Sequence, residues 1–139
     1  MLKFPIHDTK QNYLDAFWRW VALMEQDDYA GAIEALYWDK PTGWTAEKLK
    51  ERVTTFFGGD DPWHVVIPND RLIGVINDGA DCSFEPVHGG RGWFMAQIPL
   101  TTEPDDPKND EIPLVGLASS FFVREFDGQC VLEHEIFHV

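Results

Sequence analysis

Two histidines near the end of the sequence are the side chains best suited to chemistry. His134 and His138 lie in QCVLEHEIFHV, which predicts a β-strand, and their spacing of four residues places both on one face. At about 3.3 Å per residue the rings begin roughly 13 Å apart, which excludes joint binding of one metal ion. An imidazole titrates near neutral pH, so His134 or His138 could serve as a general acid or base. The alternative interpretation is a structural histidine that is hydrogen-bonded in the inner wall.

A two-residue turn, Asp127-Gly128, connects the strand that carries the histidines to the strand before it. Such a pair between two strand-like segments is a strong short-range signal for a β-hairpin. Counting outward from the turn places His134 opposite Phe121 on an apolar face that also holds Leu132. We therefore predict that His134 points into a pocket, with Phe121 and Leu132 as ligand contacts. The same register also pairs Phe126 with Gln129, Val123 with Leu132, Ser119 with Ile136 and Leu117 with His138.

The opposite face of this hairpin would present apolar side chains that no helix covers. Phe122, Phe137 and Val139 would point outward, and exposed apolar patches mark interaction surfaces. We therefore expect a homodimer across this outer face. Glu133 and Glu135 also lie on it, about 7 Å apart. A surface ion pair with Arg124 is the simpler explanation of Glu133 than a catalytic pair of carboxylates.

The hydrophobic periodicity changes from helical to extended after residue 59. Apolar spacings of three and four, with polar caps, predict helices over residues 9–27, 29–38 and 45–57. Helices followed by strands predict an α+β fold with an antiparallel sheet, and 139 residues suit one domain, 1–139. Residues 101–111 (TTEPDDPKNDE) predict a loop. Six strands are expected, at residues 63–68, 72–78, 82–88, 93–100, 114–126 and 129–139.

Composition narrows the possible partners. The formal charge of −13 disfavours nucleic acids and anionic membranes, while a basic protein partner remains possible. No apolar run of 18 residues and no signal-peptide pattern is present, so a cytoplasmic protein is expected. Cys82 and Cys130 show no metal-ligand spacing and predict reduced thiols. No calcium loop, phosphate-binding loop or nucleophile motif is visible, so neither a metal nor a cofactor is predicted.

Three segments in a fixed order give the chain a resemblance to a known superfamily. They are WVALMEQDDYAGAIEALY (20–37), which begins in the first predicted helix, GWTAEKLKERVTTFF (43–57) and the closing hairpin FFVREFDGQCVLEHEIFHV (121–139). Together they resemble the nuclear-transport-factor-two-like superfamily, which includes the SnoaL-like polyketide cyclases and has a cystatin-like α+β fold. The resemblance implies three N-terminal helices on the concave face of a curved antiparallel sheet of about six strands. It also implies a cone with an open pocket and a dimer formed by the convex side.

The resemblance also bears on the candidate site residues. In the isomerase branch, a tyrosine on the first helix and an aspartate before the third helix transfer protons. The nearest positions here hold Trp20 and Trp44, which argues against that chemistry and makes both residues candidate ligand contacts. Tyr13 and Asp39 are the closest remaining candidates for a catalytic partner of His134 or His138, although both are displaced from the pattern of the family.

Three functions remain open at this stage. The first is a small-molecule-binding protein with an aromatic-lined pocket, and the second is a cyclase, dehydratase or hydrolase that uses a pocket histidine. The third is an acidic interaction module, such as an inhibitor or immunity-like protein, that binds a basic partner. The space between the first helix and the closing hairpin distinguishes them. If Trp and Phe side chains fill that space, both small-molecule hypotheses lose the pocket on which they rest.

Overall fold

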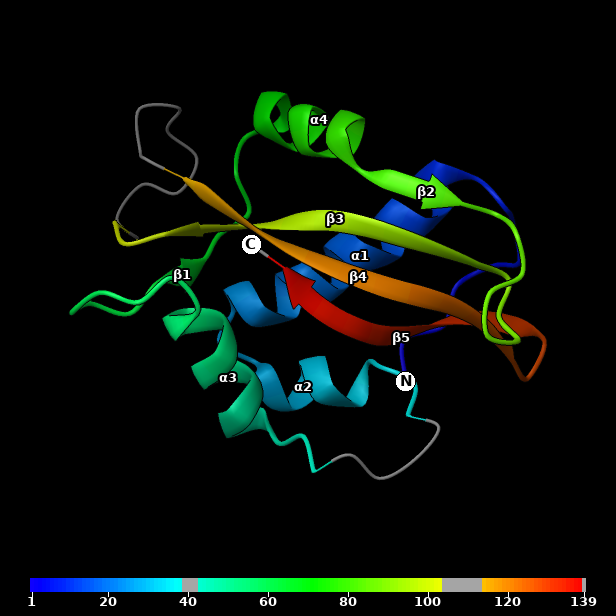
Figure 1. Ribbon diagram of the computed structural model, residues 1–139, viewed down its shortest axis with the longest axis horizontal. Coiled ribbons are helices and arrows are strands. Elements are labelled where there is room, and N and C mark those ends of the chain that lie inside the picture. The colour runs from blue at the N-terminus through cyan, green and yellow to red at the C-terminus, as the bar shows by residue number, and fades with distance from the viewer. Residues whose placement is uncertain (39–42, 104–113, 139) are drawn as a thin grey trace.

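The computed structural model describes residues 1–38, 43–103 and 114–138. These residues form an α+β fold in which helices pack around a strongly curled antiparallel sheet (Figure 1). Strand β3 (Gly92–Thr101) pairs with β4 (Val115–Phe126), and β4 pairs with β5 (Gln129–His138). Two short strands, β1 (His64–Val65) and β2 (Asp81–Ser83), share the other edge of β3. The predicted class, α+β with an antiparallel sheet, is confirmed.

The N-terminal helices begin at the caps that the sequence indicates. Helix α1 (Lys10–Glu25) starts after Thr9, whose side chain accepts a hydrogen bond from the Asn12 amide. Helix α3 (Ala46–Thr55) starts after Thr45 in the same way. Helix α2 (Tyr29–Glu34) is shorter than predicted. It ends early because the Tyr37 amide donates to the carbonyl of Leu132, so the chain leaves the helix to run along the edge of β5.

The strand predicted at residues 72–78 is wrong, because this segment is helix α4 (Asp70–Gly79). Its β-branched residues suggested a strand, but Asn69 caps the helix by accepting a hydrogen bond from the Leu72 amide at 3.0 Å. Trp18 of α1 donates its indole N–H to Asn77, which ties α4 to α1. Helix α4 leads directly into β2 at one edge of the sheet (Figure 1).

The β4–β5 hairpin follows the predicted register only as far as His134. Asp127 and Gly128 have φ values of 55° and 76°, as a type I′ turn requires, and Phe121 lies opposite His134. Beyond this pair a β-bulge shifts the register, so Ser119 lies opposite Phe137 rather than Ile136. One extra residue reverses the faces of everything that follows it.

The bulge corrects the expected dimer surface. Phe137 was predicted to point outward, but it lies in the core and is only 6% exposed. Phe122 does lie on the outer face, where the ring of His88 packs against it with centroids 5.0 Å apart. Val139 lies outside the described residues. Of the three side chains expected to form the interface, the structure therefore places one on that face.

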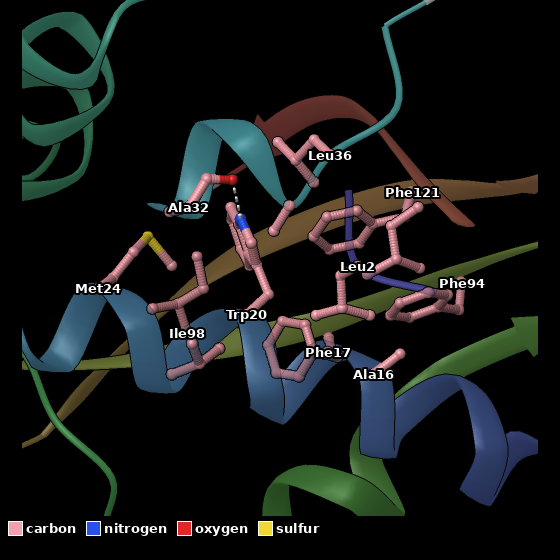
Figure 2. Close-up of a cluster of buried hydrophobic side chains, with 14 of the residues drawn as sticks. Leu2, Ala16, Phe17, Trp20, Met24, Ala32, Leu36, Phe94, Ile98 and Phe121 are labelled. Carbon is pink, nitrogen blue, oxygen red and sulfur yellow. Dashed lines mark hydrogen bonds between the residues drawn. The ribbon is translucent and has the colours of Figure 1, made fainter. Parts of the chain in front are cut away.

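Aromatic side chains from α1 and the sheet form the core. Phe17 packs edge-on against Phe94 and Phe121, and Trp20 packs edge-on against Phe121 at 5.2 Å between ring centroids. Figure 2 shows these rings filling the space between α1 and the strands behind it. The helix and the concave face of the sheet are thus in direct contact.

Candidate functional site

The interior that the resemblance implied to be a pocket is packed solid. Trp20, Phe121 and Leu132, three of the predicted ligand contacts, are each 0% exposed. The indole N–H of Trp20 donates to the Ala32 carbonyl at 3.1 Å, which satisfies its polar atom within the core (Figure 2). These three side chains offer no surface to a ligand and serve the packing of the core, so the pocket on which both small-molecule hypotheses rested is filled.

Tyr13, predicted as a catalytic partner, lies in the core about two turns before Trp20 on α1. The two residues are seven positions apart, which is about 10 Å along a helix. The Tyr13 hydroxyl donates to Asp8, whose carboxylate is held in turn by the guanidinium of Arg91. Burial, followed by the charge of Asp8, raises the pKa of Tyr13, so it remains a protonated donor. Asp39, the other predicted partner, lies outside the described residues.

A cavity of about 470 Å³ lies between α3 and the C-terminal half of β5, and we call it the α3–β5 cleft. Two of the predicted site residues, Trp44 and His134, meet in its lining. Helix α3 lies beside the end of β5 (Figure 1), and this volume falls within the range of about 300–1,000 Å³ typical of small-molecule sites. Among the described residues, the lining consists of Gly43, Trp44, Lys48, Glu51, Arg52, Thr55, His134, Glu135, Ile136 and Phe137.

His134 is held tightly where the cleft meets the core. Its Nε2 atom lies 3.0 Å from the Oγ atom of Ser119, which is 0% exposed on the neighbouring strand. Its ring also packs against Trp20, Phe121 and Phe137, with centroid distances of 6.1, 5.3 and 4.3 Å. The imidazole therefore has one polar edge turned inward and its faces covered by aromatic rings.

The hydrogen bond to Ser119 fixes which nitrogen of His134 carries the proton. Within the described part of the chain, His134 is the sole hydrogen-bond partner of the Ser119 hydroxyl, and the hydroxyl is shielded from water. If Nε2 donated, the hydroxyl proton would be buried without an acceptor, at a cost of about 1–3 kcal/mol. The hydroxyl therefore donates to Nε2, and the proton of the neutral ring sits on Nδ1.

The Nδ1–H group of His134 faces the cleft. Among the described residues, no buried side-chain nitrogen or oxygen lacks a hydrogen-bond partner. Nδ1 has no partner in this part of the chain, so it must be reachable by solvent, and the cleft is the cavity that His134 lines. Burial, and then the proximity of His138, lowers the pKa of His134 from 6.5 to about 4. At neutral pH the cleft therefore meets an uncharged N–H donor.

His138, the second predicted catalytic histidine, lies on the other side of the sheet because of the bulge. It is exposed, and its Nε2 atom lies 3.1 Å from Ser120 Oγ. The Ser120 hydroxyl also lies 3.2 Å from the Ile136 carbonyl, to which it donates. His138 does not line the α3–β5 cleft, so the structure separates the two histidines rather than placing them on one face.

Four charged side chains complete the cleft. Lys48 donates from Nζ to the Gly43 carbonyl at 3.1 Å, and the Arg52 guanidinium lies over the ring of Phe56. Glu135 accepts a hydrogen bond from the indole of Trp93 at 2.9 Å, and Glu51 supplies the second negative charge. With neutral His134, the formal charges of the described lining residues therefore sum to zero, in a chain of net charge −13.

Sequence patterns could have revealed more of this cleft than was predicted. Lys48, Arg52 and Thr55 recur at spacings of four and three, which places them on one face of α3. Ser119 was already expected on the inner face with His134, but its pairing with the imidazole requires the actual register. No periodicity or motif indicates that this face of α3 approaches β5.

Comparisons with known proteins do not assign the chain to a family. No protein-family model matches the chain, and neither a curated protein nor a solved structure matches it. In the described ranges, no group of three or more histidine, cysteine or acidic side chains is arranged to hold a metal ion. No helix within these ranges is long and apolar enough to cross a membrane. The geometry of the cleft therefore carries the functional interpretation.

Proposed function

We propose that the protein binds a small molecule in the α3–β5 cleft and that His134 contributes a neutral hydrogen-bond donor. The single observation that carries this proposal is the orientation of the His134 ring. A buried serine occupies Nε2, and Nδ1–H is left to face a cavity of about 470 Å³. A polar atom that is held rigidly beside apolar walls is typical of ligand sites. Trp44, Ile136 and Phe137 provide such walls.

Catalysis by His134 has less support than binding. A general base needs a free lone pair, and the lone pair on Nε2 accepts a hydrogen bond from the Ser119 hydroxyl. Ser119 is fully buried, so it is not a nucleophile that a substrate could reach. Tyr13 is committed to Asp8 in another part of the core. Of the two partners predicted for His134, Tyr13 does not line the cleft and Asp39 lies outside the described residues.

The other expectations remain proposals with uneven support. The acidic interaction module is weakened because Arg124 binds Glu133 and Trp93 binds Glu135 on the outer face. For a homodimer across this face, Phe122 is the one predicted interface residue that lies on it, and the ring of His88 partly covers it. A distant relation to the nuclear-transport-factor-two-like superfamily is supported by the curled sheet with α1 on its concave face, and the filled interior counts against it. Cytoplasmic localisation stays an expectation.

A fragment screen by two-dimensional NMR tests the binding proposal. Uniformly ¹⁵N-labelled protein is titrated with small organic fragments, and backbone amide shifts are followed. We expect fragments to perturb amides of residues 48–55 and 134–137 together. Fragments that bind but perturb other regions, or a screen without binders, would contradict the proposal.

A double variant, Ser119→Ala with His134→Phe, connects the binding to the imidazole. It removes both members of the buried hydrogen bond, so no polar group is left unpaired and the fold should persist. We expect fragment binding to weaken while the amide spectrum remains dispersed. His138→Gln is the matched control, because it changes a histidine of the same strand that lies outside the cleft. Equal loss of binding in this control would remove the assignment to His134.

A further inference from the structure

We infer that the α3–β5 cleft is built for a monocarboxylate with an apolar body, whose carboxylate lies between the Arg52 guanidinium and the Nδ1–H group of His134. This inference rests on the proposed binding function and specifies its ligand. It depends on two groups that come from different elements, α3 and β5, and that line the same cavity. Both groups are hydrogen-bond donors, and each has an N–H group without a partner in the described part of the chain.

In the described part of the chain, the Arg52 guanidinium donates no hydrogen bond, whereas Lys48 donates one to Gly43. The one interaction of Arg52 in the described chain is with the face of Phe56, 5.5 Å from the ring centroid, and no carboxylate there forms an ion pair with it. Acidic residues outnumber basic residues 24 to 11 in the sequence. A cation that forms no ion pair with the described carboxylates is therefore unexpected in this chain. A guanidinium presents planar donors that match a carboxylate.

The hydrogen-bonding capacity of His134 favours a negatively charged ligand group over a positively charged one. Because Nε2 accepts from Ser119, the ring can offer only the Nδ1–H donor to the cleft. An ammonium group brings donors alone and would find no acceptor on this imidazole. A carboxylate oxygen can accept from Nδ1–H while its partner oxygen accepts from Arg52. Lys48 adds a second positive charge on the same face of α3.

The remaining lining limits the charge and the shape of the ligand. Glu51 and Glu135 contribute two negative charges to the same cavity, so a dianion such as phosphate would be repelled more strongly than a monoanion. Trp44, Ile136 and Phe137 contribute apolar surface to the lining. A short alkyl or aryl chain attached to the carboxylate would cover this surface and remove it from water.

Matched ligands of one shape separate the charge from the apolar contact. Hexanoate, hexanamide and hexylamine share a six-carbon chain, and phenylacetate with phenylacetamide forms an aromatic pair. Each is titrated into ¹⁵N-labelled protein at pH 7, with inorganic phosphate as a further probe. We expect each carboxylate to bind roughly tenfold more tightly than its amide, as a charge-assisted hydrogen bond would provide.

The variant Arg52→Gln locates this preference, and Lys50→Gln is its matched control. Lys50 lies on the same helix and carries the same charge, but it pairs with Asp27 outside the cleft. Arg52→Gln should lower the affinity for carboxylates roughly tenfold and leave the affinity for amides nearly unchanged, whereas Lys50→Gln should change neither.

The outcomes distinguish this inference from the binding proposal. Amides that bind at the cleft as tightly as carboxylates, or tighter binding of hexylamine or phosphate, would overturn the carboxylate inference and leave the binding function intact. A carboxylate preference that survives Arg52→Gln would also overturn it. If no probe perturbs residues 48–55 and 134–137, while other fragments do, the ligand class is wrong. If nothing perturbs them, the binding function itself fails.

Discussion

Acidification should destabilise the fold through His134, because the folded protein resists protonation of this ring. Its pKa is about 4 in the folded protein, against 6.5 for an ordinary histidine. Above pH 6.5 neither state binds the proton and the contribution is absent. Between these values the unfolded chain binds a proton that the folded chain does not, so the free energy of unfolding falls as the pH falls.

The size of this loss follows from the difference in pKa. Each unit corresponds to about 1.4 kcal/mol, so the loss is about 3 kcal/mol once the pH reaches 4. The ring borders an open cleft, and water there stabilises its charged form, which makes this figure an upper bound. Most of the loss should fall between pH 6 and about 4, between the pKa of an ordinary histidine and that of the folded ring.

Urea denaturation of the wild type and of His134→Gln measures this loss. Glutamine does not titrate, and its amide oxygen can accept the hydrogen bond from Ser119. The difference in unfolding free energy between the two proteins removes the contribution of the carboxylates that both share. We expect this difference to be constant above pH 7 and to shift against the wild type by about 2–3 kcal/mol at pH 4.5.

Two results would contradict this explanation of His134. A difference that stays flat from pH 7 to pH 4.5 would show that folded and unfolded His134 protonate alike. Long-range ¹H–¹⁵N spectra of the imidazole provide the second check, because they distinguish the two neutral tautomers. A proton on Nε2 at pH 7 would refute the assignment of the Ser119 hydrogen bond, and with it the donor that faces the cleft.

Three further predictions concern the fold that holds the cleft. Gly128→Val should destabilise by more than about 1 kcal/mol in urea denaturation, since valine disfavours the positive φ of this turn; an unchanged midpoint would contradict the hairpin geometry. Phe137→Ala should cost about 3–5 kcal/mol, whereas Ile136→Ala should cost under about 1 kcal/mol, and the reverse order would place the bulge wrongly. Asn69→Ala should cost about 1 kcal/mol with a loss of helical circular dichroism, and no change in either signal would argue against the α4 cap.

Local signals in the sequence predicted the elements whose ends are specified by neighbouring residues. Thr9 and Thr45 cap their helices, and the Asp127-Gly128 turn sets the register of the hairpin as far as His134. Caps and tight turns involve hydrogen bonds over a few residues, so their geometry is largely independent of the rest of the fold. The Asn69 cap of α4 is also a local signal, but Pro68-Asn69-Asp70 is equally typical of a turn between two strands.

Contacts between distant segments decided the rest. The sequence alone determined an acidic α+β chain with an inward-facing His134, whereas the β-bulge beyond His134 depends on how the curled sheet closes against the helices. That bulge moves Phe137 into the core and His138 to the opposite side. Whether aromatic rings fill the space under α1 depends on their volumes and on the helix position, which no periodicity encodes. The cleft lies beside α3, where Arg52 and His134 line one cavity. These residues are distant in the sequence, so only the tertiary structure decides that they meet.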